Sequence, residues 1–192
     1  LHAVYTDDDP VTGGRAGEEK WQVTTGAGIG VRPLVDDDTV YFGSFDSKVY
    51  AVDVDDGSPR WLEPFDTGNW IWAEMLLHEG RLYVPSLDHN LYVLDASSGT
   101  EFRDRRVETG GAIRGAPALV AENFILIANE EEETWWIDIS TGTSRAGIAL
   151  TSPVYAPVSS MGANGLIYAQ NGRLYRVAPA ARQPVQIYPQ SD

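Results

Sequence analysis

The feature that most constrains the fold of this chain is an internal repeat of about 42 residues. The segment "SKVYAVDVDDGSPRW" at 47–61 returns in a closely similar form as "HNLYVLDASSGTEFR" at 89–103. The aspartate inside this segment recurs at intervals of 42 and 43 residues, with an alanine 40 residues further on: Asp53, Asp95, Asp138 and Ala178. A fixed interval of this size indicates stacked copies of one structural unit.

A second element keeps the same interval. A threonine–glycine pair followed by an isoleucine occurs three times, and a valine takes the isoleucine's place 41 residues after the third: Ile29, Ile71, Ile113 and Val154. Because two unrelated elements share one interval, the repeat belongs to the architecture of the chain and not to a single motif.

Each unit is predicted to contain four short antiparallel strands. Apolar and polar residues alternate in "KVYAVDV" and "NLYVLDA", which is typical of strands, and turns such as "DDGS" and "SSGT" follow them. Four strands in about 42 residues match one blade of an all-β propeller, whose blades cover each other's apolar faces. The expected blades are 31–66, 73–108, 115–149 and 156–190, preceded by a partial blade at 1–24.

The sequence thus predicts four complete blades and an N-terminal half blade in one domain over 1–192. Three ways of completing the ring stay open: a compact five-bladed ring, closure between molecules, and membership of a larger propeller with seven or eight blades.

The tryptophans that end two units carry a family resemblance. "YAVDVDDGSPRW" and "TGGRAGEEKW" resemble the repeat of PQQ-like, quinoprotein-type β-propellers, which include BamB-like proteins and many uncharacterised exported bacterial members. The resemblance implies that Trp21 and Trp61 dock against the next blade, and that the protein lies in the periplasm, on the cell surface or outside the cell. Arg103 and Ala146 occupy the docking position in the third and fourth units, so those contacts are expected to be weaker or differently built.

Charge and composition exclude several classes of partner. The net charge of −14 repels phosphate backbones, which argues against nucleic acid as a partner. No apolar run approaches the length of a membrane span, and the first residues lack the basic and apolar regions of a signal peptide. The chain has no cysteine, so neither disulfides nor thiolate chemistry are available.

A binding site is predicted where side chains vary on the constant framework. The position after each repeated apolar residue holds a different residue in each unit: Gly30, Trp72, Arg114 and Tyr155. Arg32, Trp70 and Glu74 are close to these positions in sequence. Variable loops on a repeated scaffold are typical of a binding surface. The alternative is that the aromatic side chains plug the axial channel while the arginines are solvated.

The sequence favours a non-catalytic scaffold that binds protein segments or extracellular polymers. A PQQ-dependent dehydrogenase or another propeller enzyme is the alternative, because the resembling family includes such enzymes. No acidic pair matches the calcium-and-quinone site of those enzymes, and "DVDDGSP" at 53–59 lacks the distant glutamate of a calcium loop. The three histidines of the chain are widely separated in sequence, so no metal-binding spacing is present among them. Hence no catalytic residue, no metal, and neither PQQ nor calcium is expected.

Overall fold

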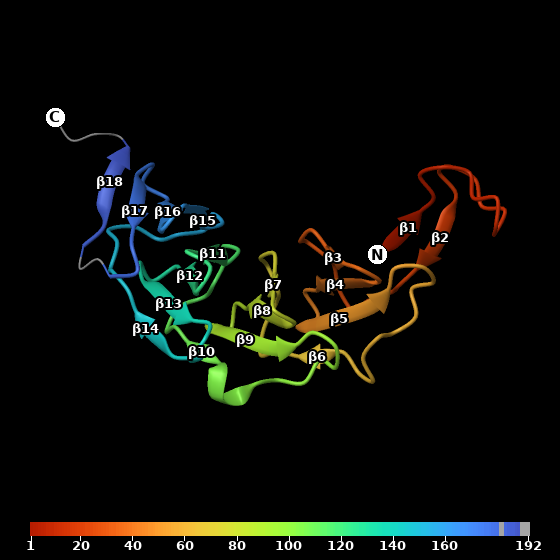
Figure 1. The fold of residues 1–192 in the computed structure, drawn as a ribbon, viewed down its shortest axis with the longest axis horizontal. Helices are drawn as coiled ribbons and strands as arrows, with labels where there is room; N and C mark the ends of the chain where they lie inside the picture. Colours follow the sequence, from red (N-terminus) through yellow and green to blue (C-terminus); the bar gives the residue numbers. More distant parts are fainter. Residues whose placement is uncertain (181–182, 189–192) are drawn as a thin grey trace.

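The chain folds into an open arc of small β-sheets, which Figure 1 shows from the N-terminal to the C-terminal end. This computed structural model describes residues 1–180 and 183–188. The four-stranded sheets are β3 (Leu34–Asp36) to β6 (Phe65–Asp66), β7 (Leu76–His78) to β10 (Val107–Glu108), β11 (Ala118–Val120) to β14 (Ser144–Ala146), and β15 (Ser159–Met161) to β18 (Val185–Tyr188). A two-stranded sheet, β1 (His2–Val4) and β2 (Glu19–Gln22), precedes them.

Every pairing within these sheets is antiparallel, and in each four-stranded sheet the strands lie in chain order. The middle strands are β4 (Thr39–Gly43), β5 (Lys48–Asp53), β8 (Arg81–Pro85), β9 (Asn90–Asp95), β12 (Phe124–Ala128), β13 (Thr134–Asp138), β16 (Asn164–Tyr168) and β17 (Leu174–Val177). The first strand of each sheet lies on the concave side of the arc, and the fourth lies on the convex side (Figure 1). The predicted all-β propeller fold of four-stranded blades is therefore confirmed.

Two details differ from the sequence-based expectation or lie beyond it. The sequence predicted no helix, whereas Arg103–Arg105 form a 3₁₀ helix, η1, between β9 and β10. The expected last blade extends to residue 190, and residues 189 and 190 lie outside the described part of the chain. Within the described residues, no helix is long and apolar enough to cross a membrane.

The core consists of the layers between neighbouring sheets. In β8, Leu82 and Val84 pack toward the preceding sheet, while Tyr83 packs toward the following one. All three side chains are buried. Because both faces of the middle strands are covered, alternate residues serve different neighbours, and burying each large apolar side chain stabilises the fold by roughly 1.5–3 kcal/mol.

Blade docking repeats through the whole arc. In each case a side chain near the last strand of one sheet donates a hydrogen bond to a backbone carbonyl of the next sheet. The accepting residue comes directly after the repeat aspartate, or after Ala178 in the last sheet. The indole Nε1 of Trp21 lies 2.9 Å from the Val54 oxygen, and that of Trp61 lies 2.9 Å from the Ala96 oxygen. Glycines receive these indoles, since an added Cβ would lie 2.9 Å from Trp21 at Gly57 and 2.6 Å from Trp61 at Gly99.

The docking residues of the next two blades differ from the predicted ones. Arg105 donates to the Ile139 oxygen at 3.3 Å, and Arg145 donates to the Pro179 oxygen. The expected residue Arg103 is exposed instead, because the 3₁₀ helix moves the docking position two residues along the chain. Ala146 is exposed too and pairs with Trp135 across the sheet. These contacts use guanidinium groups where the first two use indoles.

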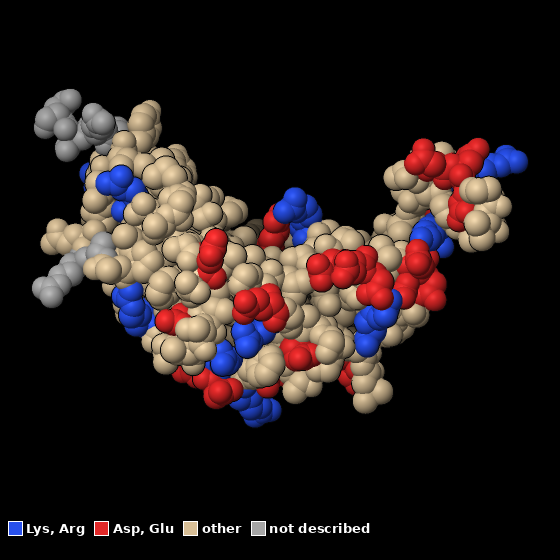
Figure 2. All heavy atoms as spheres, viewed as in Figure 1, with Lys and Arg blue, Asp and Glu red and all other residues tan. Residues whose placement is uncertain are grey.

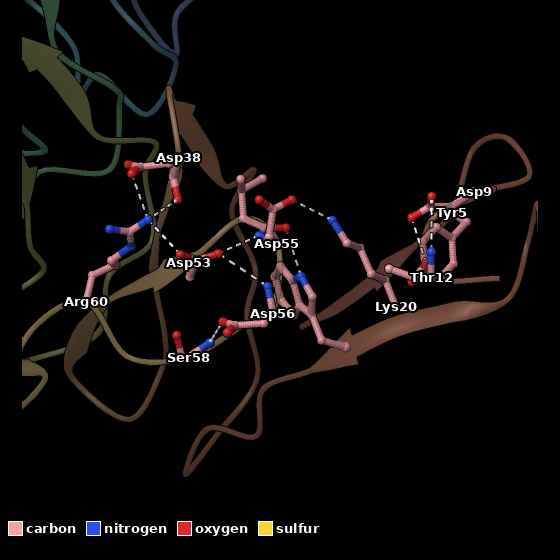
Figure 3. Close-up of polar contacts among 12 residues, drawn as sticks. Tyr5, Asp9, Thr12, Lys20, Asp38, Asp53, Asp55, Asp56, Ser58 and Arg60 are labelled. Carbon is pink, nitrogen blue, oxygen red and sulfur yellow. Dashed lines mark hydrogen bonds and ion pairs between the residues drawn. The ribbon is translucent and has the colours of Figure 1, made fainter. Parts of the chain in front are cut away.

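The N-terminal half blade is also attached by charge. Lys20 lies 2.9 Å from the Asp55 carboxylate, as Figure 3 shows. Beside it, Arg60 bridges Asp38 at 2.7 Å and Asp53 at 2.6 Å, which ties two turns of the first complete sheet together. Figure 2 shows acidic side chains gathered around β3 to β5 and at the β1–β2 end.

Candidate functional site

All the sequence-predicted site residues lie on one face of the arc. We define the crest face by the loops leading into the first strand of each sheet, 25–33, 67–75, 109–117 and 151–158, and by the turns between its second and third strands, 44–47, 86–89, 129–133 and 169–173. The turns 37–38 and 79–80 lie at the opposite ends of the first strands. The strand direction therefore separates the crest face from the turns that carry Asp37 and Asp38.

The crest loops are joined from one blade to the next by backbone hydrogen bonds. Ile71 donates to the Ser44 oxygen at 3.3 Å, and Ile113 repeats the bond to Ser86 at 3.3 Å. Within the second complete blade, Leu87 donates to the Trp70 oxygen at 3.1 Å and so ties the turn 86–89 to the loop 67–75. Such cross-links fix the backbone of the crest loops, so the side chains that vary there are displayed on a rigid support.

An aromatic platform occupies the crest between the first two complete blades. Phe45 stacks on Trp70 with ring centroids 5.1 Å apart and on Trp72 at 5.3 Å. Each indole is 46% exposed. We call these three residues the aromatic platform.

Glycine and a buried isoleucine determine the geometry of this platform. A Cβ at Gly30 would lie 2.3 Å from the Phe45 ring, so only glycine leaves room for the ring there. Ile71 separates the two tryptophans in sequence and is fully buried, which directs its neighbours outward. Glycine at the first of the variable positions is thus a packing requirement of Phe45.

Two ion pairs lie on the crest, one between the two blades that carry the platform residues and one in the next blade. Arg32 and Glu74 occupy equivalent positions in adjacent blades, and their side chains meet at 2.9 Å. Arg114 donates to Glu130 at 2.8 Å, and its guanidinium lies 5.8 Å from the centre of the Tyr155 ring. The Tyr155 ring is 44% exposed.

The structure thus gathers the predicted residues into three groups: Trp70 with Trp72, Arg32 with Glu74, and Arg114 with Tyr155. Sequence reasoning missed Phe45, which stacks on both tryptophans, and Glu130, which accepts from Arg114. Both hold the position after the first residue of a crest turn, where the four blades carry Phe45, Leu87, Glu130 and Gln170. This position varies between blades as much as the position after the repeated apolar residue, so the sequence carries a signal for both residues.

A groove adjoins the Arg32–Glu74 pair on the concave side of the arc. It encloses about 340 Å³ and is lined by Pro33, Leu34, Val35 and Met75 in addition to the ion pair. Among the described residues, no group of three or more histidine, aspartate or glutamate side chains is arranged to hold a metal ion. The crest face therefore offers stacking, charge and hydrogen bonding to a ligand.

A half-buried carboxylate, Asp88, accepts a hydrogen bond from the crest loop that carries Trp70 and Trp72. Burial opposes ionisation of Asp88, but hydrogen bonds from the Tyr92 hydroxyl at 2.5 Å and the Gly68 N–H at 2.6 Å outweigh it and lower the pKa of Asp88. Burial and the same carboxylate raise the pKa of Tyr92 to about 12. Asp46, Tyr50 and Gly26 form the equivalent network one blade earlier.

This network predicts a pH-dependent contribution to stability. A carboxyl whose folded pKa is lowered stabilises the fold above its unfolded pKa of about 3.9, and the contribution is lost as the pH falls through the folded pKa. We expect Asp88→Asn to lower the free energy of unfolding by about 1.5–3 kcal/mol at pH 7. The difference from the parent should shrink below about pH 4.

Urea unfolding at pH 7 and at about pH 2.5, well below the unfolded pKa, measures the free energies of the parent and the variant. Tyr92→Phe serves as a milder control, because it removes one donor and leaves the carboxyl in place. A parent–variant difference that stays constant between the two pH values contradicts the assignment.

The fold is shared with solved propellers. BamB from Moraxella catarrhalis superposes with a TM-score of 0.74 at 16% identity, over 90% of this chain and 52% of that one. The computationally designed Ika4 protein gives 0.70 at 18% identity, over 84% of this chain and 98% of that one. The designed Ika8 protein gives 0.64 at 16% identity, over 80% and 46%. This chain spans about half the length of the BamB structure.

No curated protein matches the chain by sequence. A family model does match, over residues 9–153 of the 192, and its description is outer membrane protein assembly factor BamB. The predicted resemblance to PQQ-like propellers is confirmed by this match. The chain therefore belongs to the BamB-like family of PQQ-type β-propellers.

Proposed function

We propose that this chain is a non-catalytic scaffold outside the cytoplasm that binds a segment of a partner protein on its crest face. The observation that carries the proposal is the aromatic platform, two indoles each 46% exposed on a hydrogen-bonded support. Tryptophan, tyrosine and arginine are the side chains that most often dominate protein interfaces, and the crest displays all three.

Family membership supports the same proposal. The matching family is described as an assembly factor, which is a role exercised through other proteins. The description of that family also names the outer membrane, which supports a location in the periplasm or at the cell surface. An extracellular polymer is the alternative ligand, since exposed indoles also stack on sugar rings.

Selection from a displayed peptide library tests where such segments bind. We expect peptides selected on the parent chain to bind Trp72→Ala and Arg114→Ala at least about tenfold more weakly, equal to about 1.4 kcal/mol, as measured by fluorescence polarisation. Leu62→Ser is the matched control, because Leu62 is 97% exposed on the outer loop before β6. Peptides that bind all four proteins equally would place the binding surface away from the crest.

The scaffold proposal also entails that PQQ and calcium have no specific site on this chain. Adding both should leave the melting temperature unchanged and should produce no change in quinone absorbance. A saturable increase in melting temperature would instead favour the dehydrogenase alternative, because a ligand that binds only the folded state stabilises it.

A further inference from the structure

We propose that the aromatic platform recognises arginine, with the guanidinium group of a partner segment stacked on Trp70 and Trp72. This inference rests on the proposed function and adds the chemical class of the side chain that is bound. Its first support is a contrast within the chain. The Arg106 guanidinium lies 4.7 Å from the Tyr92 ring centre, and that of Arg114 lies 5.8 Å from the Tyr155 ring centre.

The two indoles of the platform lack such a cation. Within the described residues, no arginine or lysine of this chain lies over Trp70 or Trp72. Arg32 is held elsewhere on the crest, because its guanidinium is paired at 2.9 Å with Glu74, two residues after Trp72. Indole presents the most favourable π-face for a cation, so the platform leaves open a site of the kind that the chain fills itself on Tyr92 and Tyr155.

The platform is also organised before any ligand binds. The Trp70 backbone is held at both groups, since its N–H donates to the Asn69 side chain at 2.8 Å and its carbonyl accepts from Leu87 at 3.1 Å. Phe45 stacks on both rings. Little side-chain freedom is therefore lost on binding, which favours affinity.

Hydrogen-bonding capacity complements the stacking. Among the described residues, no side chain or carbonyl accepts from the indole N–H of Trp70 or Trp72, and both rings are partly exposed. An extended peptide carries backbone carbonyls that would accept from them. The platform thus offers a π-face to a cation and two donors to the chain that carries it.

Charge selects the sign of the ligand. The net charge of −14 attracts basic segments over a distance and repels acidic polymers. Asp46 and Asp88 lie in the crest turns 44–47 and 86–89, one in each of the two blades that flank the platform. Each carboxylate accepts a hydrogen bond from a backbone N–H of a crest loop. Arginine is favoured over lysine, because a planar and weakly hydrated guanidinium stacks on an aromatic ring while an ammonium group keeps its water.

Three capped peptides of identical length, differing only in arginine, lysine or neutral citrulline at two positions, provide the test. The indole N–H signals of Trp70 and Trp72 in the parent protein are followed by NMR, and affinities are measured by calorimetry. We expect the arginine peptide to shift both signals and to bind at least about tenfold more tightly than the citrulline peptide. The lysine peptide should rank between them.

Variants separate the platform from general charge attraction. Trp70→Ala combined with Trp72→Ala should weaken arginine-peptide binding by about tenfold or more. Asp36→Asn combined with Asp37→Asn removes two carboxylates at the far end of β3 and should change the affinity by less than about threefold at 150 mM salt. Asparagine tolerates the left-handed backbone of residue 37, where φ is 46°, so this control should fold.

The outcomes distinguish this inference from the proposed function. Equal binding of arginine and citrulline peptides overturns arginine recognition, while library-selected peptides that still require the crest leave the scaffold in place. A loss of binding in the Asp36/Asp37 variant but not in the tryptophan variant overturns it as well. A neutral oligosaccharide that shifts the two indole signals when the arginine peptide does not would overturn both proposals and assign the platform to glycans.

Discussion

Replacing Trp61 with alanine is expected to lower the free energy of unfolding by about 3–5 kcal/mol, which is a large part of the 5–15 kcal/mol that keeps a typical domain folded. The indole is 4% exposed and packs in the layer between the first two complete sheets. Its removal leaves a cavity against Gly99, where φ of +73° and close contact with the ring restrict any compensating side chain. Urea unfolding followed by circular dichroism measures the loss.

Three further variants, each expected to cost less than Trp61→Ala, serve as comparisons. Trp61→Phe keeps most of the packing but loses the 2.9 Å hydrogen bond to the Ala96 oxygen, so it should cost clearly less than alanine. Arg105→Ala removes the corresponding contact of the next blade, where the side chain is only half-buried, and should cost about 1–2 kcal/mol. Leu62→Ala should stay within about 0.5 kcal/mol of the parent. A Trp61→Ala loss below about 1 kcal/mol would show that this docking contact does not hold the blades together.

The repeat made the strands and their stacking predictable, for a physical reason. Residues such as Leu82, Tyr83 and Val84 must satisfy two neighbouring sheets at once, so apolar side chains recur with both the strand period and the blade period. The docking role of Trp61 was predicted because the tryptophan that ends the repeat resembles the docking tryptophan of PQQ-like propellers. Arg105 could not, because a 3₁₀ helix moved the position and an arginine gives no apolar signal.

The candidate site was predictable in its location and less so in its contacts. Arg32 and Glu74 occupy one repeat position in adjacent blades, so their pairing follows from lateral stacking and could have been anticipated. Phe45 was not predicted because the variation between blades was read from the loops before the first strands, whereas Phe45 lies in a turn between the second and third strands. Its stacking on Trp70 and Trp72 depends on the space that Gly30 leaves for the phenyl ring. Nothing in the sequence distinguishes Gly30 from the other glycines of the chain.

The distance between neighbouring blades could not be predicted from the repeat either. At Gly115 this distance is short enough to exclude a side chain. A Cβ at Gly115 would lie 2.2 Å from the backbone oxygen of Ala156 in the next blade, although the equivalent positions of other blades hold Val31 and Ala73. The third and fourth complete blades approach more closely here, and Val158 donates to the Ala116 oxygen at 3.1 Å.

We therefore expect Gly115→Ala to lower the free energy of unfolding by about 2–3 kcal/mol, because the obstructing atom belongs to a backbone that is hydrogen-bonded to the same segment. Gly28→Ala is the matched control. A Cβ there meets only the Phe45 ring at 3.5 Å, an ordinary contact, so the variant should match the parent or exceed it slightly through a less flexible unfolded chain. Urea unfolding of the three proteins distinguishes the cases, and equal stability of both variants would mean that the two blades separate at little cost.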